Sequence, residues 1–267
     1  MRIGIFTTTD AVWALPTWAR TIPALQERHQ VVGLYLFPQQ LGRMTGARIP
    51  LWYAWVFGLA NAAILALYAV AARRRGRRAR IGTWQQLAAT YRLELRRGES
   101  PNADEPVAWL QEAEIDVLFI MVGKILTPRT LAAARVAVVN KHASILPSAR
   151  GLFPYFWGRL KGLPTGISFH AVDEGIDTGP ILVQERYPPN EDAGMSMLRF
   201  YIDAYARYLR LALAALEQLE TGGSVAPPAD VAPSYFGFPT RADHAEFRRG
   251  SHAVARLSDL WHESEAG

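Results

Sequence analysis

Short apolar runs of strand length alternate with helix-like segments along most of this chain of 267 residues. The runs lack the polar alternation of a half-exposed strand, so they are typical of strands buried on both faces of a sheet. Alternation of this kind predicts an α/β fold with a mostly parallel central sheet and helices on both faces. The predicted parallel strands are residues 2–6, 30–37, 116–122 and 136–140, and the predicted helices are residues 13–27, 83–91, 105–114 and 127–135.

The second half of the chain departs from this alternation. Residues 167–172 and 181–185 are strand-like runs that we expect to be antiparallel to each other. Residues 195–220 predict one long helix, because their leucines recur at helical spacing on one stripe and a pair of glycines follows. Several prolines make the remainder irregular. The sequence therefore predicts one domain over residues 1–222 and a wrapping C-terminal arm over residues 223–267.

An apolar segment interrupts the pattern within residues 38–80. Residues 49–72 carry no charge, and residues 73–80 (RRRGRRAR) follow with six arginines. The length and the basic flank are those of a transmembrane helix, but a span would separate strands that belong to one sheet. We expect instead a re-entrant hairpin, an in-plane helix or a helix packed on protein, divided by Pro50, Gly58 or Asn61. Attachment to an anionic membrane surface is the preferred interpretation, and packing on the domain or on a partner subunit is the alternative.

The composition excludes several function classes. The net charge of +5 depends on the six clustered arginines, since 5 − 6 = −1 for the rest, so a broad nucleic-acid-binding face is not expected. The absence of cysteine excludes a disulfide scaffold, an iron–sulfur protein and a cysteine nucleophile. No His/Glu spacing predicts a metal site, and no secretory signal is apparent. The expected location is the cytoplasm, with peripheral attachment to the inner face of the membrane as the hypothesis for the apolar segment.

Two polar stretches follow predicted strands. Asn140 and His142 lie two residues apart in an extended segment, so their side chains point to the same side. An amide donor and a titratable imidazole can together stabilise a developing oxyanion and move a proton. Residues 173–179 (DEGIDTG) combine two glycines with carboxylates that can shift the pKa of a nearby imidazole. Each feature taken alone is more often structural than catalytic.

Together these stretches resemble the formyltransferases that use 10-formyltetrahydrofolate. NKHASILPSARG, from residue 140, resembles their N-x-H-x-S-x-L-P-x-x-x-G signature, and DEGIDTGPIL, from residue 173, resembles their second signature. DVLFIMVGKILTP, from residue 116, resembles the strand and loop beside their folate pocket. The resemblance implies a Rossmann-like formyltransferase fold, with residues 1–222 as the catalytic domain and residues 38–80 as an insertion outside the resemblance.

The resemblance also implies the site residues. The catalytic residues would be Asn140, His142 and Asp177. The folate-binding residues would be Lys124, Ile125 and Leu126 in one loop and Asp173 and Glu174 in another. In the implied reaction an amine attacks the formyl carbon, Asn140 and a protonated His142 stabilise the oxyanion, and Asp177 raises the pKa of His142.

The family resemblance leaves the acceptor open. The preferred acceptor is the primary amine of an amino sugar, linked to a nucleotide or to a lipid. We disfavour tRNA because the tRNA-directed members of the family carry a sizeable additional C-terminal domain. A formyltetrahydrofolate hydrolase and a membrane-tethered, non-catalytic binding protein are the alternatives, and a homodimer is a further hypothesis.

Overall fold

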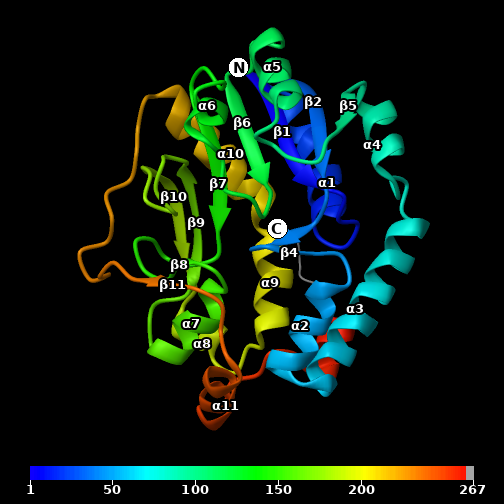
Figure 1. Ribbon diagram of the computed structural model, residues 1–267. Coiled ribbons are helices and arrows are strands. Elements are labelled where there is room, and N and C mark those ends of the chain that lie inside the picture. The colour runs from blue at the N-terminus through cyan, green and yellow to red at the C-terminus, as the bar shows by residue number, and fades with distance from the viewer. Residues whose placement is uncertain (263–267) are drawn as a thin grey trace.

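A seven-stranded sheet forms the centre of the computed structural model, which describes residues 1–262 (Figure 1). Its strands are β1 (Arg2–Thr8), β2 (Gln30–Phe37), β5 (Glu94–Arg97), β6 (Val117–Met121), β7 (Ala137–His142), β9 (Gly166–Ala171) and β10 (Ile181–Arg186). The order is β10-β9-β7-β6-β1-β2-β5. The five strands from β7 to β5 are parallel, whereas β9 is antiparallel to both β7 and β10. The predicted mostly parallel α/β sheet and the antiparallel pair are confirmed.

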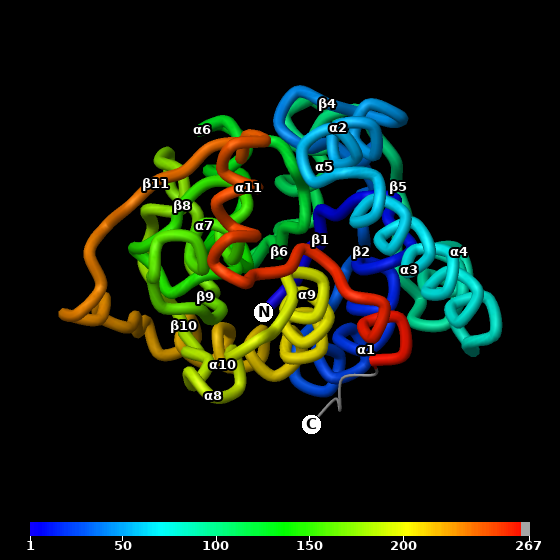
Figure 2. The backbone as a smooth tube through the Cα atoms, turned by 90° about the horizontal axis from the view of Figure 1, so that it is seen from below, coloured from blue at the N-terminus to red at the C-terminus, as the bar shows by residue number. Residues whose placement is uncertain are grey.

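Helices cover both faces of the sheet (Figures 1 and 2). On one face α1 (Ala14–Gln26) and α10 (Tyr208–Glu220) bury apolar side chains such as Ile5, Phe119 and Phe169. On the other face α5 (Asp104–Glu112) and α6 (Pro128–Leu131) accompany a second core that includes Phe6 and Leu118. The remaining α-helices outside the insertion are α4 (Trp84–Tyr91), α7 (Pro154–Lys161), α8 (Pro189–Asp192), α9 (Met197–Ala206) and α11 (Arg241–Arg249).

The insertion folds into a helical hairpin. After two short strands, β3 (Gln40–Leu41) and β4 (Met44–Thr45), the chain forms α2 (Arg48–Phe57) and α3 (Leu59–Arg78). Gly58 separates the helices with φ of 84°, a conformation that costs a glycine little. The inner side of α2 buries Val56 and Phe57 in the main core. Within residues 1–262, no helix combines the length and apolar character needed to cross a membrane.

Three expectations about elements are wrong. Residues 195–220 form α9 and α10 rather than one helix; the break falls at Arg207, whose guanidinium pairs with Glu185 and Glu191. The helix predicted over residues 127–135 is only α6. The arm is not irregular throughout, because it contains β11 (Tyr235–Phe236), α11 and the 3₁₀ helix Leu257–Trp261. β11 pairs with β8 (Arg150–Gly151), whose two residues end the first signature stretch.

Candidate active site

The end of β7 carries the first two site residues. Asn140 lies opposite His170 of β9 in the sheet register, and His142 lies opposite Ser168. The Asn140 Nδ2 is 3.4 Å from His170 Nε2. His170 Nδ1 lies 2.9 Å from the carbonyl oxygen of Ala171, so Nδ1 donates to that oxygen.

Asp177 completes the cluster from the loop that follows β9. Its Oδ2 lies 3.4 Å from His142 Nδ1, and its Oδ1 lies 3.5 Å from His170 Nε2. The backbone N–H of Gly151 donates to Oδ2 at 2.9 Å. The structure therefore brings together Asn140, His142 and Asp177, as the sequence predicts, and adds His170 as a fourth member.

Burial and the neighbouring groups shift the pKa values of Asp177 and His142 in ways that the sequence alone only partly predicts. Burial alone would raise the pKa of Asp177, but the two histidines and the Gly151 N–H outweigh it and lower the pKa to about 2. Burial lowers the pKa of His142, and this effect exceeds the opposite effects of Asp177 and the Ala149 carbonyl. Asp177 therefore acts on His142 in the predicted direction, but the net shift is downward because burial outweighs it, and His142 Nε2 lies 2.9 Å from Ala149 O.

The backbone around the cluster adopts uncommon conformations. Asp177 and Ala149 have φ of 53° and 49°, in the left-handed region that non-glycine residues rarely occupy. Gly151 has φ of 93°, and a Cβ there would lie 2.3 Å from the carbonyl oxygen of Phe236. Such conformations persist only where the surrounding structure holds them. Here Ser234 of the arm supplies part of that support, since its Oγ accepts from the Ala149 N–H at 2.8 Å.

The predicted folate-binding residues lie in two loops outside this cluster. In the loop after β6, Ile125 is 67% exposed, Leu126 is buried and Lys124 donates to Ser100. The side chain of Asn102 holds this loop through Ile125 O and Thr127 N. Asp173 and Glu174 are exposed in the loop after β9, where the Asp173 carboxylate accepts from Gly175 N and Thr178 Oγ1.

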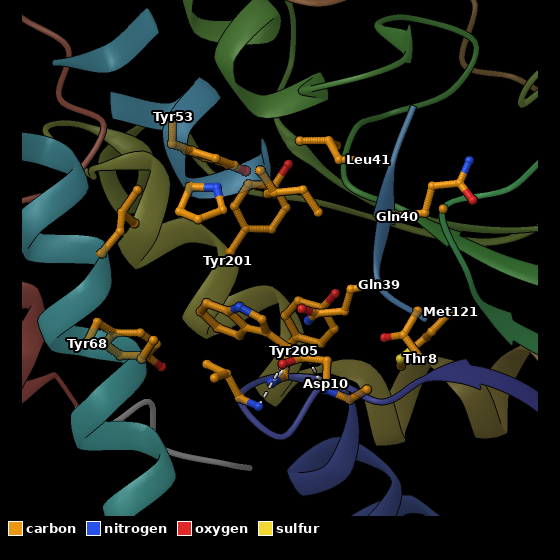
Figure 3. A pocket seen from close by; sticks show the side chains of 18 of the residues that line it. Thr8, Asp10, Gln39, Gln40, Leu41, Tyr53, Tyr68, Met121, Tyr201 and Tyr205 are labelled. Carbon is orange, nitrogen blue, oxygen red and sulfur yellow. Dashed lines mark hydrogen bonds between the residues drawn. The ribbon is translucent and has the colours of Figure 1, made fainter. Parts of the chain in front are cut away.

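A cavity of about 610 Å³ lies at the carboxyl edge of the parallel strands (Figure 3). Asn140 lines it, together with residues 120–123 at the end of β6, but the five predicted folate-binding residues, His142 and Asp177 do not. Aromatic side chains form much of its wall, as Figure 3 shows for Tyr53 of α2, Tyr68 of α3, and Tyr201 and Tyr205 of α9. The insertion and α9 therefore enclose the space beside Asn140.

Asp10 and Lys141 are charged residues that line the cavity. Asp10 is held by hydrogen bonds, and Lys141 is desolvated. The carboxylate of Asp10 accepts from the N–H groups of Val12, Trp13 and Ala14, so it occupies the donors at the start of α1 that could bind an anion. Lys141 points to the face opposite Asn140, with its Nζ 3.6 Å from the centre of the Tyr205 ring. Burial lowers the pKa of Lys141 to about 7.

Comparison with known proteins places the chain in a family. The profile of the formyl transferase family matches residues 62–199, which is 138 of the 267 residues and includes Asn140, His142, His170 and Asp177. The chain belongs to the formyl transferase family. No three His, Cys, Asp or Glu side chains within residues 1–262 are grouped so as to hold a metal ion.

A sequence relative of this formyl transferase family member matches part of the chain, and two solved structures match most of it. The methionyl-tRNA formyltransferase of Sorangium cellulosum (strain So ce56) is 40% identical over 110 residues, which are 40% of this chain and 35% of that protein. The chain thus spans little more than a third of that relative. A sugar N-formyltransferase from Shewanella sp FDAARGOS_354 has a TM-score of 0.55 at 15% identity, covering 94% of this chain and 87% of that one. The N-formyltransferase from Helicobacter canadensis, solved with folinic acid and dTDP-3-aminofucose, has a TM-score of 0.54 at 14% identity, covering 93% and 80%. The two structures establish the shared Rossmann-like formyltransferase fold.

Sequence reasoning missed several residues of the site in this family member. His170 is the one ionisable residue of the buried strand β9, and an ionisable side chain in such a strand was the available signal. Lys141 lies inside the first signature itself, where a charged residue between Asn140 and His142 is visible in the sequence. The cavity tyrosines come from segments far apart in the chain, so no local pattern could group them.

Proposed function

We propose that the chain is an N-formyltransferase that moves a formyl group from 10-formyltetrahydrofolate to the primary amine of an amino sugar. The observation that carries this proposal is the cluster of amide, two imidazoles and a carboxylate at the end of β7, beside an aromatic cavity. Membership of the formyl transferase family supports the reaction class.

The loop after β6 fits the pterin of the donor. The backbone N–H groups of residues 123–126 make no hydrogen bond to any residue that the structure describes, while Asn102 fixes the loop from behind. Such a fixed edge of donors and carbonyls can pair with a heteroaromatic ring that carries both donors and acceptors. Lys124, Ile125 and Leu126 would hold the donor on this side, and Asp173 and Glu174 on the other. When bound, the donor supplies the electrophilic formyl carbon.

The cluster would then assist the transfer. The amine nitrogen bonds to the formyl carbon, and the bond from that carbon to the donor nitrogen breaks. The Asn140 amide would donate to the formyl oxygen as negative charge develops on it. A neutral His142 would take the proton that the amine loses, and the proton would lie between Nδ1 and the Asp177 carboxylate before it passes to the leaving nitrogen. Asp177 would lower the cost of the transient imidazolium.

The cavity supports an amino sugar as the acceptor. Its tyrosine rings offer flat apolar faces to a sugar ring, and their hydroxyl groups offer hydrogen bonds. A structural relative was solved with a nucleotide-linked amino sugar, which supports the same substrate class here. Methionyl-tRNA is the second candidate, because curated relatives with matching segments are methionyl-tRNA formyltransferases.

The test is tetrahydrofolate formation from 10-formyltetrahydrofolate, with water alone, with a nucleotide-linked amino sugar and with methionyl-tRNA. We expect formation only with the amino sugar, and a loss of about 100-fold or more in His142→Ala. His252→Gln, which changes a histidine packed on Phe247 in the arm, serves as the matched control. Turnover with water alone would indicate a hydrolase, turnover with methionyl-tRNA would identify the second candidate, and no turnover with any of them would contradict the proposal.

A further inference from the structure

The outward side of the α2–α3 hairpin is apolar and has no protein partner within the described chain. Leu59, Leu51 and Trp55 are 80%, 68% and 61% exposed, and Leu67 and Val70 are exposed as well. Every other exposed residue from 50 to 72 is alanine, glycine or proline. We call these exposed residues the hairpin face.

Helical spacing separates the hairpin face from the side that packs on the protein. Leu59, Leu67 and Val70 recur on one stripe of α3, and Arg74 continues that stripe. Tyr68 lies on the opposite stripe, where it stacks on Trp13 at 5.2 Å between ring centres. Packing of the inner side therefore accounts for the fold of the hairpin but leaves the apolar outer side unexplained.

Positive charge surrounds the hairpin face. Arg43 and Arg48 precede it, six arginines follow it within residues 73–80, and all eight are exposed. The sequence contains no acidic residue between Glu27 and Glu94. An apolar surface flanked by unopposed arginines is complementary to a lipid surface, where acyl chains lie beneath anionic phosphates.

We propose that the hairpin face docks on a membrane that contains anionic lipids, with its apolar side chains at the headgroup boundary and its arginines on the phosphates. A second copy of the chain is a poorer occupant. In a two-fold dimer this patch would meet itself and bring arginines together, with no acidic residue in the segment to offset them.

Docking would place the candidate active site at the lipid surface, and this step rests on the proposed function. The same hairpin forms a wall of the cavity, and its exposed residues Pro50, Ala66 and Arg73 also line that cavity. Figure 1 shows α2 and α3 beyond the carboxyl ends of β1 and β6, and Thr8 and Met121 at those strand ends line the cavity. The acceptor amine would therefore be carried by a lipid and would reach the cavity from the membrane.

Vesicle sedimentation tests the docking directly. The full chain is mixed with vesicles of phosphatidylcholine alone or with added phosphatidylglycerol, at low and high salt. We expect binding to the anionic vesicles that weakens as salt screens the arginines. The variant Arg74→Gln/Arg77→Gln/Arg78→Gln should lose at least about tenfold in vesicle affinity, and Leu59→Gln/Leu67→Gln should weaken binding at both salt concentrations.

Matched controls change the same residue types elsewhere. Arg241→Gln/Arg248→Gln/Arg249→Gln alters three exposed arginines of α11, and Val136→Gln/Leu257→Gln alters two exposed apolar residues. These controls should bind vesicles like the wild type. A wild type that does not bind anionic vesicles, or hairpin variants that bind as well as the controls, would overturn the proposal. So would a wild-type dimer that Leu59→Gln/Leu67→Gln dissociates without vesicles, because the hairpin face would then be a self-interface.

Measuring formyl transfer to a soluble acceptor distinguishes failure of the membrane proposal from failure of the proposed function. Without vesicles, the hairpin variants should formylate a soluble nucleotide-linked amino sugar at the wild-type rate. Failed docking with intact turnover would overturn only the membrane inference, whereas absent turnover in the wild type would contradict the proposed function. With an amine-bearing lipid in anionic vesicles, the wild type should exceed the arginine variant in rate by about the same factor as in binding. Equal rates would contradict the lipid-borne acceptor.

Discussion

At the residue scale, Asp177 combines an ionised carboxylate with a left-handed backbone. Asparagine tolerates that backbone better than most residues, so Asp177→Asn removes the charge with little strain. We expect turnover to fall by about 100-fold or more, because the imidazolium formed on His142 loses its counter-charge. Steady-state kinetics with the identified acceptor would measure this fall. A variant that keeps its rate would contradict the assigned role of Asp177.

The same substitution carries a stability prediction. The folded-state pKa of Asp177 is about 2, below the ordinary value of about 3.9, so its contribution to stability is present above pH 4 and lost as pH falls toward 2. The free energy of unfolding of Asp177→Asn should be lower than that of the wild type by about 2 kcal/mol at pH 7. Urea unfolding across this range should show the difference shrinking as pH decreases from 4. A constant difference would indicate that hydrogen bonding, not charge, accounts for it.

Lys141 should also make stability rise with pH, but over a higher pH range and because burial penalises its charged form. Its folded pKa of about 7 lies below the ordinary value of about 10.4, so the unfolded chain binds more protons between these values and stability rises with pH. Lys141→Met should be more stable than the wild type by on the order of 1 kcal/mol at pH 6, and the gain should fade toward pH 10. Urea unfolding at several pH values measures this, with the exposed Lys161→Met as control. A gain that does not depend on pH would contradict a desolvated ammonium.

At the element scale, the elements whose bounds depend on local sequence pattern were predicted correctly. β2 has the predicted bounds, and Gly58 divides the insertion as one of three candidate positions. Where tertiary contacts decide, prediction failed. The break between α9 and α10 lies at Arg207, which is held by carboxylates from β10 and α8, and no glycine or proline signals it. β5 has the charged sequence ELRR, which an edge strand accepts but an apolar pattern does not reveal.

The same limit applies to the candidate site. Asn140 and His142 could be paired from strand alternation alone, whereas Asp177 needed the family resemblance. The burial that lowers the pKa of His142 depends on residues from several elements, so the direction of that shift could not be predicted from the sequence.

Two glycines of the hairpin, Gly58 and Gly76, should respond to substitution by alanine with opposite changes in stability. Gly58 has φ of 84°, so Gly58→Ala should lower the free energy of unfolding by about 1–2 kcal/mol. Gly76 lies within α3 with open space around its Cα, so Gly76→Ala should raise it by up to about 1 kcal/mol. Thermal unfolding compares the two. Because the hairpin forms a wall of the cavity, Gly58→Ala should also raise the KM for the acceptor, while Gly76→Ala leaves it unchanged. Equal effects of the two substitutions would contradict a strained junction.

At the scale of the whole molecule, the arm connects the C-terminal part of the chain to the candidate site. The backbone of β11 pairs with Arg150 and Gly151, and Ser234 holds Ala149. These residues in turn contact the candidate cluster, since Ala149 O accepts from His142 and Gly151 N–H donates to Asp177. The arm, although it lies outside the family profile, is therefore part of the support for His142 and Asp177.

Phe236 tests this support, because its ring stacks on Trp157 of α7 at 4.9 Å and 13° and anchors β11. Phe236→Ala should lower the free energy of unfolding by about 1–3 kcal/mol through lost packing. It should also lower kcat by about tenfold or more, because residues 149–151 no longer hold the imidazole and the carboxylate in register. Leu257→Ala, an exposed apolar residue of the same arm, should change neither quantity. Urea unfolding and steady-state kinetics separate the two effects, and a variant that loses stability at an unchanged kcat would show that the arm stabilises the fold without positioning the cluster.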